Sequence, residues 1–287
     1  MRQQGEGNST IGVAVPFLIV RIGVKAGQWG WSVDELATSW RATEDAGFDI
    51  LACFDHVSAS PQPRAAWDAP TLLAAMAGST ERVTLAVRVL NVCLRHPFLL
   101  AAQLAVAQAA SGGRLDVGLG AGSPGLARYD HEALGIPFPP FAERMARLEA
   151  ACRALPALWR GDRVDDLGLG LSGAGLGDIG IEAPRLTIGG TSARALSIAA
   201  QYADGWNLST SDPATFEAAR TKLDRACEEA ERKDPITAEA QLWARDLWTD
   251  PRSHLSALGD AGAAAVILIL DEERGPDEVR RLAEAVL

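Results

Sequence analysis

The stretch RLTIGGTSARALSIAAQYADGWNLS, from Arg185 to Ser209, decides the fold of this chain. Its apolar residues 185–189 predict a strand, its alanine-rich residues 192–202 predict a helix, and residues 205–209 predict a second strand. Short apolar runs that alternate with longer segments of helical period are typical of βα units around a parallel sheet. The stretch therefore predicts an α/β protein.

The same alternation covers most of the rest of the chain. Strands are predicted at residues 17–24, 49–55, 83–89, 114–119, 185–189, 205–209, 240–247 and 265–270. Helices are predicted at residues 33–46, 67–79, 97–110, 141–159, 192–202, 213–233, 251–261 and 276–286. Eight strands, each followed by a helix, predict a (β/α)8 TIM barrel. An open doubly wound sheet uses the same alternation and stays the alternative.

The domain organisation follows from this count. Residues 20–287 are predicted to form a single barrel domain, and residues 1–19 an N-terminal extension. Residues 160–184 are irregular and rich in glycine, which predicts an insertion loop between the fourth helix and the fifth strand. Glycines 168, 170 and 173 satisfy GxGxxG there, but no predicted strand precedes them, so a dinucleotide site is not predicted.

Composition and charge exclude several classes of protein. The 287 residues are 48% hydrophobic and 22% charged, as in a globular chain, and the net charge of -10 disfavours nucleic acid and membrane surfaces as partners. The four cysteines form no CxxC pair and no spacing with histidine that indicates a zinc site, so we expect no metal. Reduced thiols and the lack of a run of ~20 apolar residues indicate a cytoplasmic protein, with a cleaved signal peptide as the alternative.

In a barrel of this kind ligands bind at the carboxyl ends of the strands. Asp55 and His56 end the second strand, and a carboxylate beside an imidazole there can provide a general acid or base near neutral pH. Arg88 and Asn91 are the polar members of the apolar third strand. They indicate a ligand edge, although an arginine paired with a neighbouring carboxylate is an equal alternative.

Two glycine-rich strand ends complete the predicted site. Gly120 and Gly122 follow the fourth strand, where glycine lets a backbone approach a flat ligand or simply permits a tight turn. The fifth strand ends in two glycines and two hydroxyl residues directly before a helix that contains Arg194, an order typical of a phosphate cradle. The cradle residues are Gly189, Gly190, Thr191 and Ser192.

Taken together, five motifs resemble the luciferase-like monooxygenase superfamily, and within it the oxidoreductases that use the deazaflavin coenzyme F420. The resemblance covers residues 21–287. The motifs are DHV at 55–57, WDAPTLLAAMA from Trp67, RHPFLLAAQLA from Arg95, SGGRLDVGLGAG from Ser111 and IGGTSARALSIAAQYADGWN from Ile188.

The resemblance implies a luciferase-like barrel that holds the cofactor ring in its mouth and the cofactor phosphate at the cradle. Asp55 and His56 would border the reactive ring, and His56 would exchange a proton with the substrate. Arg88 and Val89 match a bulged third strand with a non-proline cis peptide, and Asn91 matches a polar ring contact. Relatives of this kind imply a homodimer.

Two departures bear on the substrate. Sugar-phosphate dehydrogenases of this family carry a glutamate after the glycines of the fourth strand and a tryptophan four residues after the histidine. This chain has Ser123 and Ser60 at those places. The resemblance therefore does not carry the sugar-phosphate substrate over.

Three functions follow as hypotheses. The first is an F420-dependent oxidoreductase that transfers a hydride between the cofactor and a small organic substrate. The alternative is an FMN-dependent monooxygenase that uses oxygen and reduced flavin from a separate reductase. The third is a non-catalytic barrel that binds a flavin-like cofactor.

Overall fold

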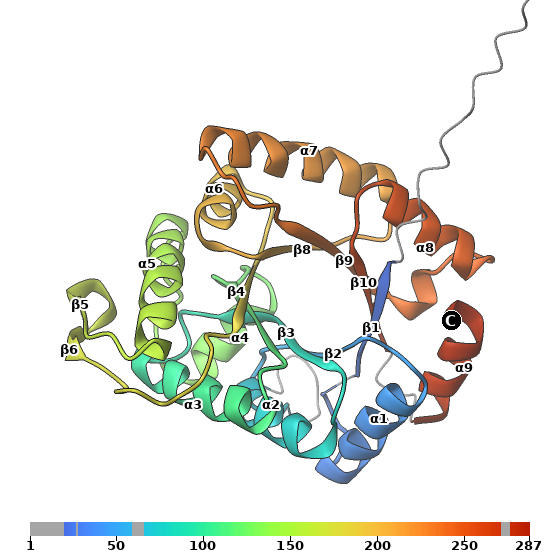
Figure 1. Cartoon of the computed structure of the whole chain (residues 1–287), viewed down its shortest axis with the longest axis horizontal. Coiled ribbons are helices and arrows are strands. Elements are labelled where there is room, and N and C mark those ends of the chain that lie inside the picture. The colour runs from blue at the N-terminus through green and yellow to red at the C-terminus, as the bar shows by residue number, and fades with distance from the viewer. Residues whose placement is uncertain (1–19, 27, 59–65, 271–275) are drawn as a thin grey trace, which may run out of the picture.

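The computed structural model of the chain describes residues 20–26, 28–58, 66–270 and 276–287. Eight parallel strands close into a barrel in the order β1-β10-β9-β8-β7-β4-β3-β2, and helices surround it (Figure 1). The predicted TIM barrel is confirmed. The open sheet is excluded because β1 pairs with β10 as well as β2, beginning with Arg21 opposite Ala265.

All eight predicted strands and all eight predicted helices are present, with some ends displaced. The barrel strands are β1 (Arg21–Lys25), β2 (Ile50–Cys53), β3 (Thr84–Asn91), β4 (Leu115–Gly120), β7 (Arg185–Gly189), β8 (Gly205–Ser209), β9 (Thr237–Trp243) and β10 (Ala265–Ile269). The surrounding helices are α1 (Val33–Asp45), α2 (Ala69–Ser79), α3 (Pro97–Ala110), α5 (Phe141–Trp159), α6 (Ala193–Tyr202), α7 (Pro213–Glu229), α8 (Pro251–Asp260) and α9 (Pro276–Val286).

Strand β9 shows the largest displacement. It begins three positions before the predicted start, and residues 244–246 form a 3-10 turn, η2 (Ala244–Asp246), where a strand was predicted. Ala238 and Ala240 are buried on one side of β9, while Glu239 points into the barrel and is buried as well. The start of the strand was not predicted because the charged side chain inside the barrel interrupts the apolar run on which the prediction depends.

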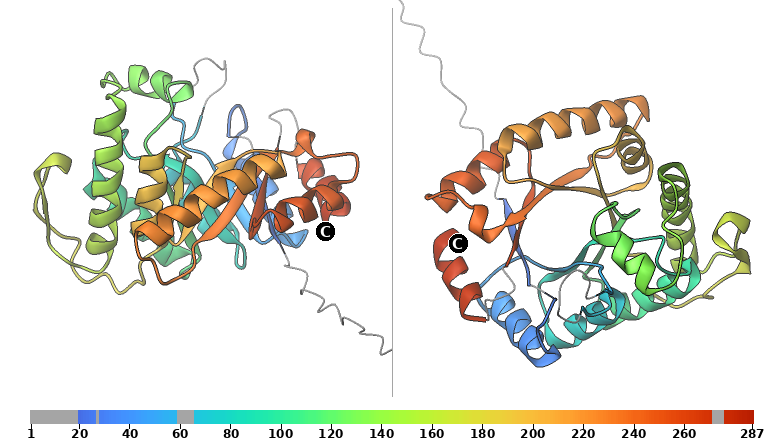
Figure 2. Two further views of the ribbon diagram at one scale, coloured as in Figure 1. Left: turned by 90° about the horizontal axis from the view of Figure 1, so that it is seen from above. Right: turned by 180° about the vertical axis from the view of Figure 1, so that it is seen from behind.

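Two regions contain structure that the sequence did not predict. Helix α4 (Leu126–Ala133) lies over one end of the barrel between β4 and α5 (Figure 2). The segment predicted as a loop contains an antiparallel hairpin of β5 (Val164–Asp166) and β6 (Leu171–Ala174), joined by η1 (Leu167–Leu169). The GxGxxG glycines lie in and beside this hairpin on the outer side of α5, away from the barrel (Figure 1).

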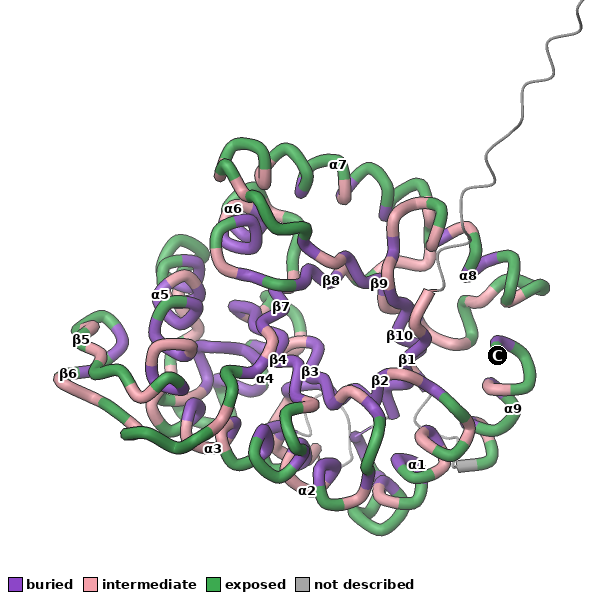
Figure 3. Tube along the Cα trace, in the orientation of Figure 1, coloured by how far each residue is buried: buried purple, intermediate pink, exposed green. Residues whose placement is uncertain are grey.

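The core lies on both sides of the strands. Strand residues are buried almost throughout, and the helices turn buried faces inward and exposed faces outward (Figure 3). Buried strand residues such as Leu51, Leu85 and Leu268 read as continuous apolar runs because helices cover the outer face of a parallel barrel. No helix within the described residues is long and apolar enough to span a membrane. The predicted extension, residues 1–19, lies outside them, so the division at residue 20 stays a prediction.

Candidate active site

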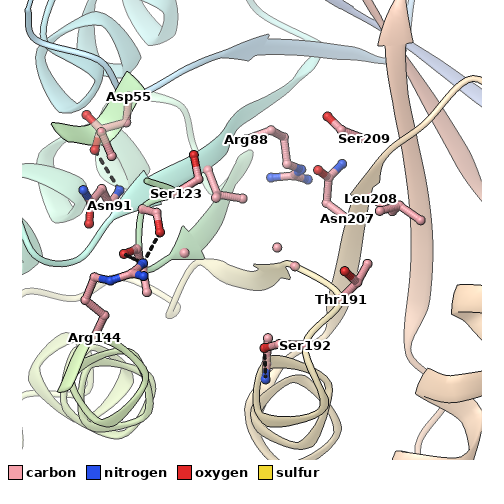
Figure 4. A pocket seen from close by; sticks show the side chains of 18 of the residues that line it. Asp55, Arg88, Asn91, Ser123, Arg144, Thr191, Ser192, Asn207, Leu208 and Ser209 are labelled. Atoms are coloured by element: carbon pink, nitrogen blue, oxygen red, sulfur yellow. Dashed lines mark hydrogen bonds between the residues drawn. The ribbon is translucent and has the colours of Figure 1, made fainter. Parts of the chain in front are cut away.

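A cavity of about 670 Å³ lies at the carboxyl ends of the barrel strands. Its size is that of a cofactor or drug-sized ligand site, roughly 300–1,000 Å³. Residues from the ends of six strands and from α5 and α6 line it (Figure 4). Every predicted site residue borders this cavity: Asp55, His56, Arg88, Val89, Asn91, Gly120, Gly122, Gly189, Gly190, Thr191 and Ser192.

His56 follows β2, and its ring is held by Asp130 of α4. Nδ1 lies 2.7 Å from Asp130 Oδ2, and Nε2 makes no hydrogen bond within the described residues. Trp29 stacks on the imidazole with ring centroids 5.6 Å apart. Burial disfavours the Asp130 carboxylate, but hydrogen bonds from His56 and from the amides of Ser58 and Val57 outweigh it and lower the pKa of Asp130.

Asp55 lies beside His56 in the chain but does not bond to its ring. The Asp55 carboxylate accepts two hydrogen bonds from the Arg95 guanidinium, at 2.7 and 2.8 Å, and one from the backbone N–H of Asn91 at 2.9 Å. The two neighbours separate because successive side chains of an extended chain point to opposite sides. Asp55 thus ties the end of β2 to the end of β3 and borders the cavity with its acceptors occupied.

Arg88 adopts the ion-paired alternative that the sequence left open. Its Nε and Nη2 donate to Glu239 at 2.7 and 3.0 Å, and Nη2 lies 3.0 Å from Asp116. Lys25 lies beside it, with Nζ 3.0 Å from Gln241 Oε1, and burial lowers the pKa of Lys25 to about 8. These buried charges lie under the cavity. We call Lys25, Arg88, Asp116 and Glu239 the floor.

The bulge expected in the third strand is present. The Arg88–Val89 peptide bond is cis, and the pairing of β3 with β4 shifts between Val87 and Leu90. A Cβ on Gly120 would lie 2.5 Å from Val89 Cγ2, and one on Gly189 would lie 3.2 Å from both Val89 methyl groups. These glycines therefore admit the Val89 side chain, which explains them without a direct ligand contact.

The loop from β7 to α6 brings the predicted glycines and hydroxyl residues to the cavity, but not the predicted arginine. Gly190 has a φ of +117°, a conformation that favours glycine, and Ser192 caps α6 by accepting from the Ala195 amide. Arg194 turns away and pairs with Glu149 on α5. A cation without a carboxylate partner among the described residues is supplied instead by Arg144 of α5, which the sequence did not indicate.

Arg144 is buried and has no carboxylate partner within the described residues. Its Nε donates to Pro139 O at 3.1 Å, and its Nη1 donates to the carbonyls of Ala121 and Gly122 (Figure 4). A buried guanidinium bonded only to neutral carbonyls keeps its full positive charge available to an anion. Arg144 therefore adds the positive charge that the cradle lacks.

Asn207 of β8 is a second residue that the sequence did not single out. Its side chain is buried on the cavity wall, and Nδ2 has no hydrogen-bond partner among the residues that the structure describes. Buried donors are almost always hydrogen-bonded, so this unpaired donor beside a cavity is a candidate for contact with a ligand. Asn207 sits two residues before the end of its strand, so inspection of strand ends could have found it. Asp130 and Arg144 follow β4 by ten residues or more, so inspection of strand ends could not have found them.

The closed barrel with a cofactor-sized cavity at its strand ends defines the class of ligand-binding (β/α)8 barrels. The chain belongs to the luciferase-like monooxygenase family, whose sequence profile matches residues 14–246. It is 29% identical over 278 residues to a protein of Beutenbergia cavernae named F420-dependent glucose-6-phosphate dehydrogenase, covering 93% of this chain and 81% of that one. A protein of the same name from Intrasporangium calvum is 33% identical over 150 residues, which span 51% of this chain and 44% of the relative.

Solved structures share the fold at low identity. An F420-dependent secondary alcohol dehydrogenase in complex with an F420-acetone adduct superposes with a TM-score of 0.78 at 17% identity, covering 93% of this chain and 98% of that one. The coenzyme F420-dependent tetrahydromethanopterin reductase of Methanopyrus kandleri has a TM-score of 0.74 at 17% identity, with the same coverage. These similarities establish the luciferase-like barrel architecture.

Proposed function

We propose that the chain is an F420-dependent oxidoreductase that transfers a hydride between the coenzyme and a small organic substrate. The observation that carries the proposal is the His56–Asp130 pair, which leaves Nε2 unbonded within the described residues on a side chain that lines the same cavity as the glycine loop 189–192. The names of the relatives support the choice of cofactor. Coenzyme F420, when bound, supplies the hydride donor or acceptor at its deazaflavin ring.

Three features of the cavity fit a flat, anionic cofactor. The loop 189–192 places free amides at the start of α6, where an anion is stabilised. Arg144 adds a buried positive charge on α5. The unpaired Nδ2 of Asn207 suits a carbonyl oxygen on the edge of a ring. We therefore assign the anion to loop 189–192 and Arg144, and the ring edge to Asn207.

His56 is the residue that we assign to proton exchange. A substrate hydroxyl that is oxidised must lose a proton, and Nε2 can accept it. In the opposite direction the same nitrogen can donate a proton to a carbonyl oxygen. Trp29 and Phe54 are both buried next to the imidazole, and Trp29 stacks on it, so apolar rings border the proton-exchanging group.

The substrate class differs from that in the relatives' names. Ser123 borders the cavity where sugar-phosphate dehydrogenases carry glutamate, and the second departure, Ser60, lies outside the described residues. Apolar side chains, including Pro124, Phe141 and Met145, line the neighbouring wall. This wall favours a small alcohol or carbonyl compound over a sugar phosphate.

Parallel fluorescence titrations with coenzyme F420 and with FMN test the proposal. We expect F420 to bind more tightly and to exchange hydride with small alcohols or carbonyl compounds without consuming oxygen. Tighter binding of FMN, together with oxygen uptake when reduced FMN is supplied, would establish the monooxygenase and its need for a reductase. Binding without any turnover would leave the non-catalytic barrel.

We also infer a homodimer in the cytoplasm. Leu99 and Val106 are exposed apolar side chains on the outer surface of α3, which supports association with a second copy. All four cysteines are unpaired, as expected in a reducing compartment. Light scattering during gel filtration will measure the mass, and a monomer at micromolar concentration would refute the dimer.

A further inference from the structure

We propose that Asp130 is a positioning residue that fixes the tautomer of His56, so that the nitrogen not held by Asp130, Nε2, is the one without a proton and is free to meet a ligand in the cavity. The inference rests on the proposed function, in which His56 exchanges a proton with the substrate. It assigns a role to a helix, α4, that neither strand-end motif nor composition indicated.

The contacts of the carboxylate carry the argument. Asp130 Oδ2 lies 2.7 Å from His56 Nδ1, and Oδ1 accepts from the amides of Val57 and Ser58, each at 2.9 Å. The Asp130 side chain is 2% exposed, so water does not compete for these oxygens. An ionised carboxylate can only accept hydrogen bonds. His56 Nδ1 must therefore carry a proton, and in the neutral ring Nε2 is left bare.

Helix α4 holds this carboxylate firmly. His131, the next residue, is buried and bonds Pro137 O through Nδ1 at 2.7 Å. Its Nε2 lies 3.4 Å from Nδ2 of Asn91, at the end of β3. The two neighbours thus link α4 to the ends of both β2 and β3. A functional group that is locked by such supporting contacts keeps its orientation.

The two oxygens of Asp130 are not equivalent, and this makes the inference testable. Both backbone amides donate to Oδ1, whereas only the imidazole meets Oδ2. In the variant Asp130→Asn, the amide oxygen must take the Oδ1 position, because two N–H groups face it. The NH2 group then faces His56 Nδ1 and needs an acceptor. The ring must shift its proton to Nε2, so the cavity meets a donor instead of an acceptor.

The experiment is nitrogen NMR on the full chain labelled with 15N-histidine, at a pH where the imidazole is neutral. The chain has only four histidines, and the variant His56→Gln identifies the signals of His56. In the wild type we expect the proton on Nδ1, and in Asp130→Asn on Nε2. Asp130→Glu, which keeps an acceptor, should restore the wild-type pattern. A wild-type proton on Nε2, or an unchanged pattern in Asp130→Asn, would overturn the proposal.

Glu44→Gln is a matched control. Glu44 also accepts from consecutive backbone amides, those of residues 81–83, but it lies at the opposite ends of the strands. If removing the charge of any carboxylate bonded to backbone amides disturbed His56, both variants would change its spectrum. We expect the His56 signals of Glu44→Gln to match the wild type. If Asp130→Asn does not fold, as judged by circular dichroism, the wild-type tautomer by itself decides the proposal.

A kinetic measurement separates this inference from the proposed function. With F420 and an alcohol substrate, Asp130→Asn should lower kcat for oxidation by about 10²- to 10⁴-fold, the usual contribution of a general base, with KM essentially unchanged. The NMR result needs no cofactor. If the tautomer switches but F420 does not bind, the proposed function fails and the role of Asp130 stands.

Discussion

Beneath the cavity, the arginine and the carboxylates of the floor satisfy one another: Arg88 is bonded to both Glu239 and Asp116. At its rim, which we define as His56, Asn207 and the loop 189–192, polar atoms remain without a protein partner. Among the described residues, His56 Nε2 and Asn207 Nδ2 have no hydrogen-bond partner. The floor is buried, whereas the rim includes the exposed residues Gly190 and Thr191. The two regions also differ in whether the protein has already used their hydrogen-bonding capacity.

Substitutions in the floor and at the rim should affect different properties of the protein. A floor residue that loses its partner leaves a buried charge uncompensated, which costs folding energy. Removing an unbonded rim atom, such as His56 Nε2 or Asn207 Nδ2, breaks no hydrogen bond between described residues and so affects only a ligand. Variants of the floor should therefore move the unfolding transition, and variants of the rim should move turnover or affinity.

The largest effect is expected at the rim, in His56→Gln. Turnover should fall by about 10²- to 10⁴-fold, because the substrate loses its proton acceptor, while F420 affinity and thermal stability stay near those of the wild type. Steady-state hydride transfer, F420 titration and thermal unfolding measure the three quantities. Undiminished turnover would remove His56 from the mechanism.

At the floor, Arg88→Met should lower the free energy of unfolding by about 3–5 kcal/mol, the usual cost of breaking a buried ion pair. The substitution leaves two carboxylates facing an apolar side chain. Urea denaturation measures the change. The control is Arg194→Met, which breaks a half-exposed pair with Glu149 and should cost less than about 1 kcal/mol. Equal effects in both variants would contradict the distinction between floor and surface.

Lys25 gives the floor a dependence on pH. Burial disfavours its ammonium form and lowers its pKa to about 8, outweighing the attraction of Cys53, so between pH 8 and 10.5 the unfolded chain binds more protons. The contribution of Lys25 to stability therefore rises with pH through this window, by about 3 kcal/mol. Lys25→Met abolishes this contribution.

The measurement is urea denaturation of wild type and Lys25→Met across pH 7 to 10.5. The stability of Lys25→Met relative to wild type should be greatest at pH 7 and should decline as the pH rises. Comparing the two proteins cancels the titration of the cysteines, whose pKa values burial raises. A constant difference would show that Lys25 titrates normally.

The smallest effect belongs to Asn207→Leu, again at the rim. F420 affinity should fall by roughly three- to tenfold, the value of one neutral hydrogen bond. The free energy of unfolding should not fall, because an unpaired buried donor is removed. Isothermal titration and urea denaturation measure the two. A loss of stability without a loss of affinity would show that Asn207, like the floor residues, stabilises the fold and does not bind the cofactor.

Local patterns accounted for the barrel and for most of the cavity lining. Loop 189–192 could be recognised because its glycines, its capping serine and the helix follow one another in the chain. Strand β9 was displaced in the prediction because Glu239 faces inward to meet Arg88, a partner 151 residues away. Helix α4 was missed because it is short and its three buried residues, Ala127, Asp130 and His131, are mostly polar.

The alternation of strands and helices, and with it the end of the barrel at which a ligand is expected, could be predicted from the sequence because they follow from local periodicity and turn residues. Which polar side chains are unbonded became known only from the folded barrel. Asp55 is adjacent to His56 in the chain, yet Asp130, 74 residues away, holds the imidazole. Hydrogen-bond partners depend on the direction and distance of side chains, and these exist only once the barrel has closed.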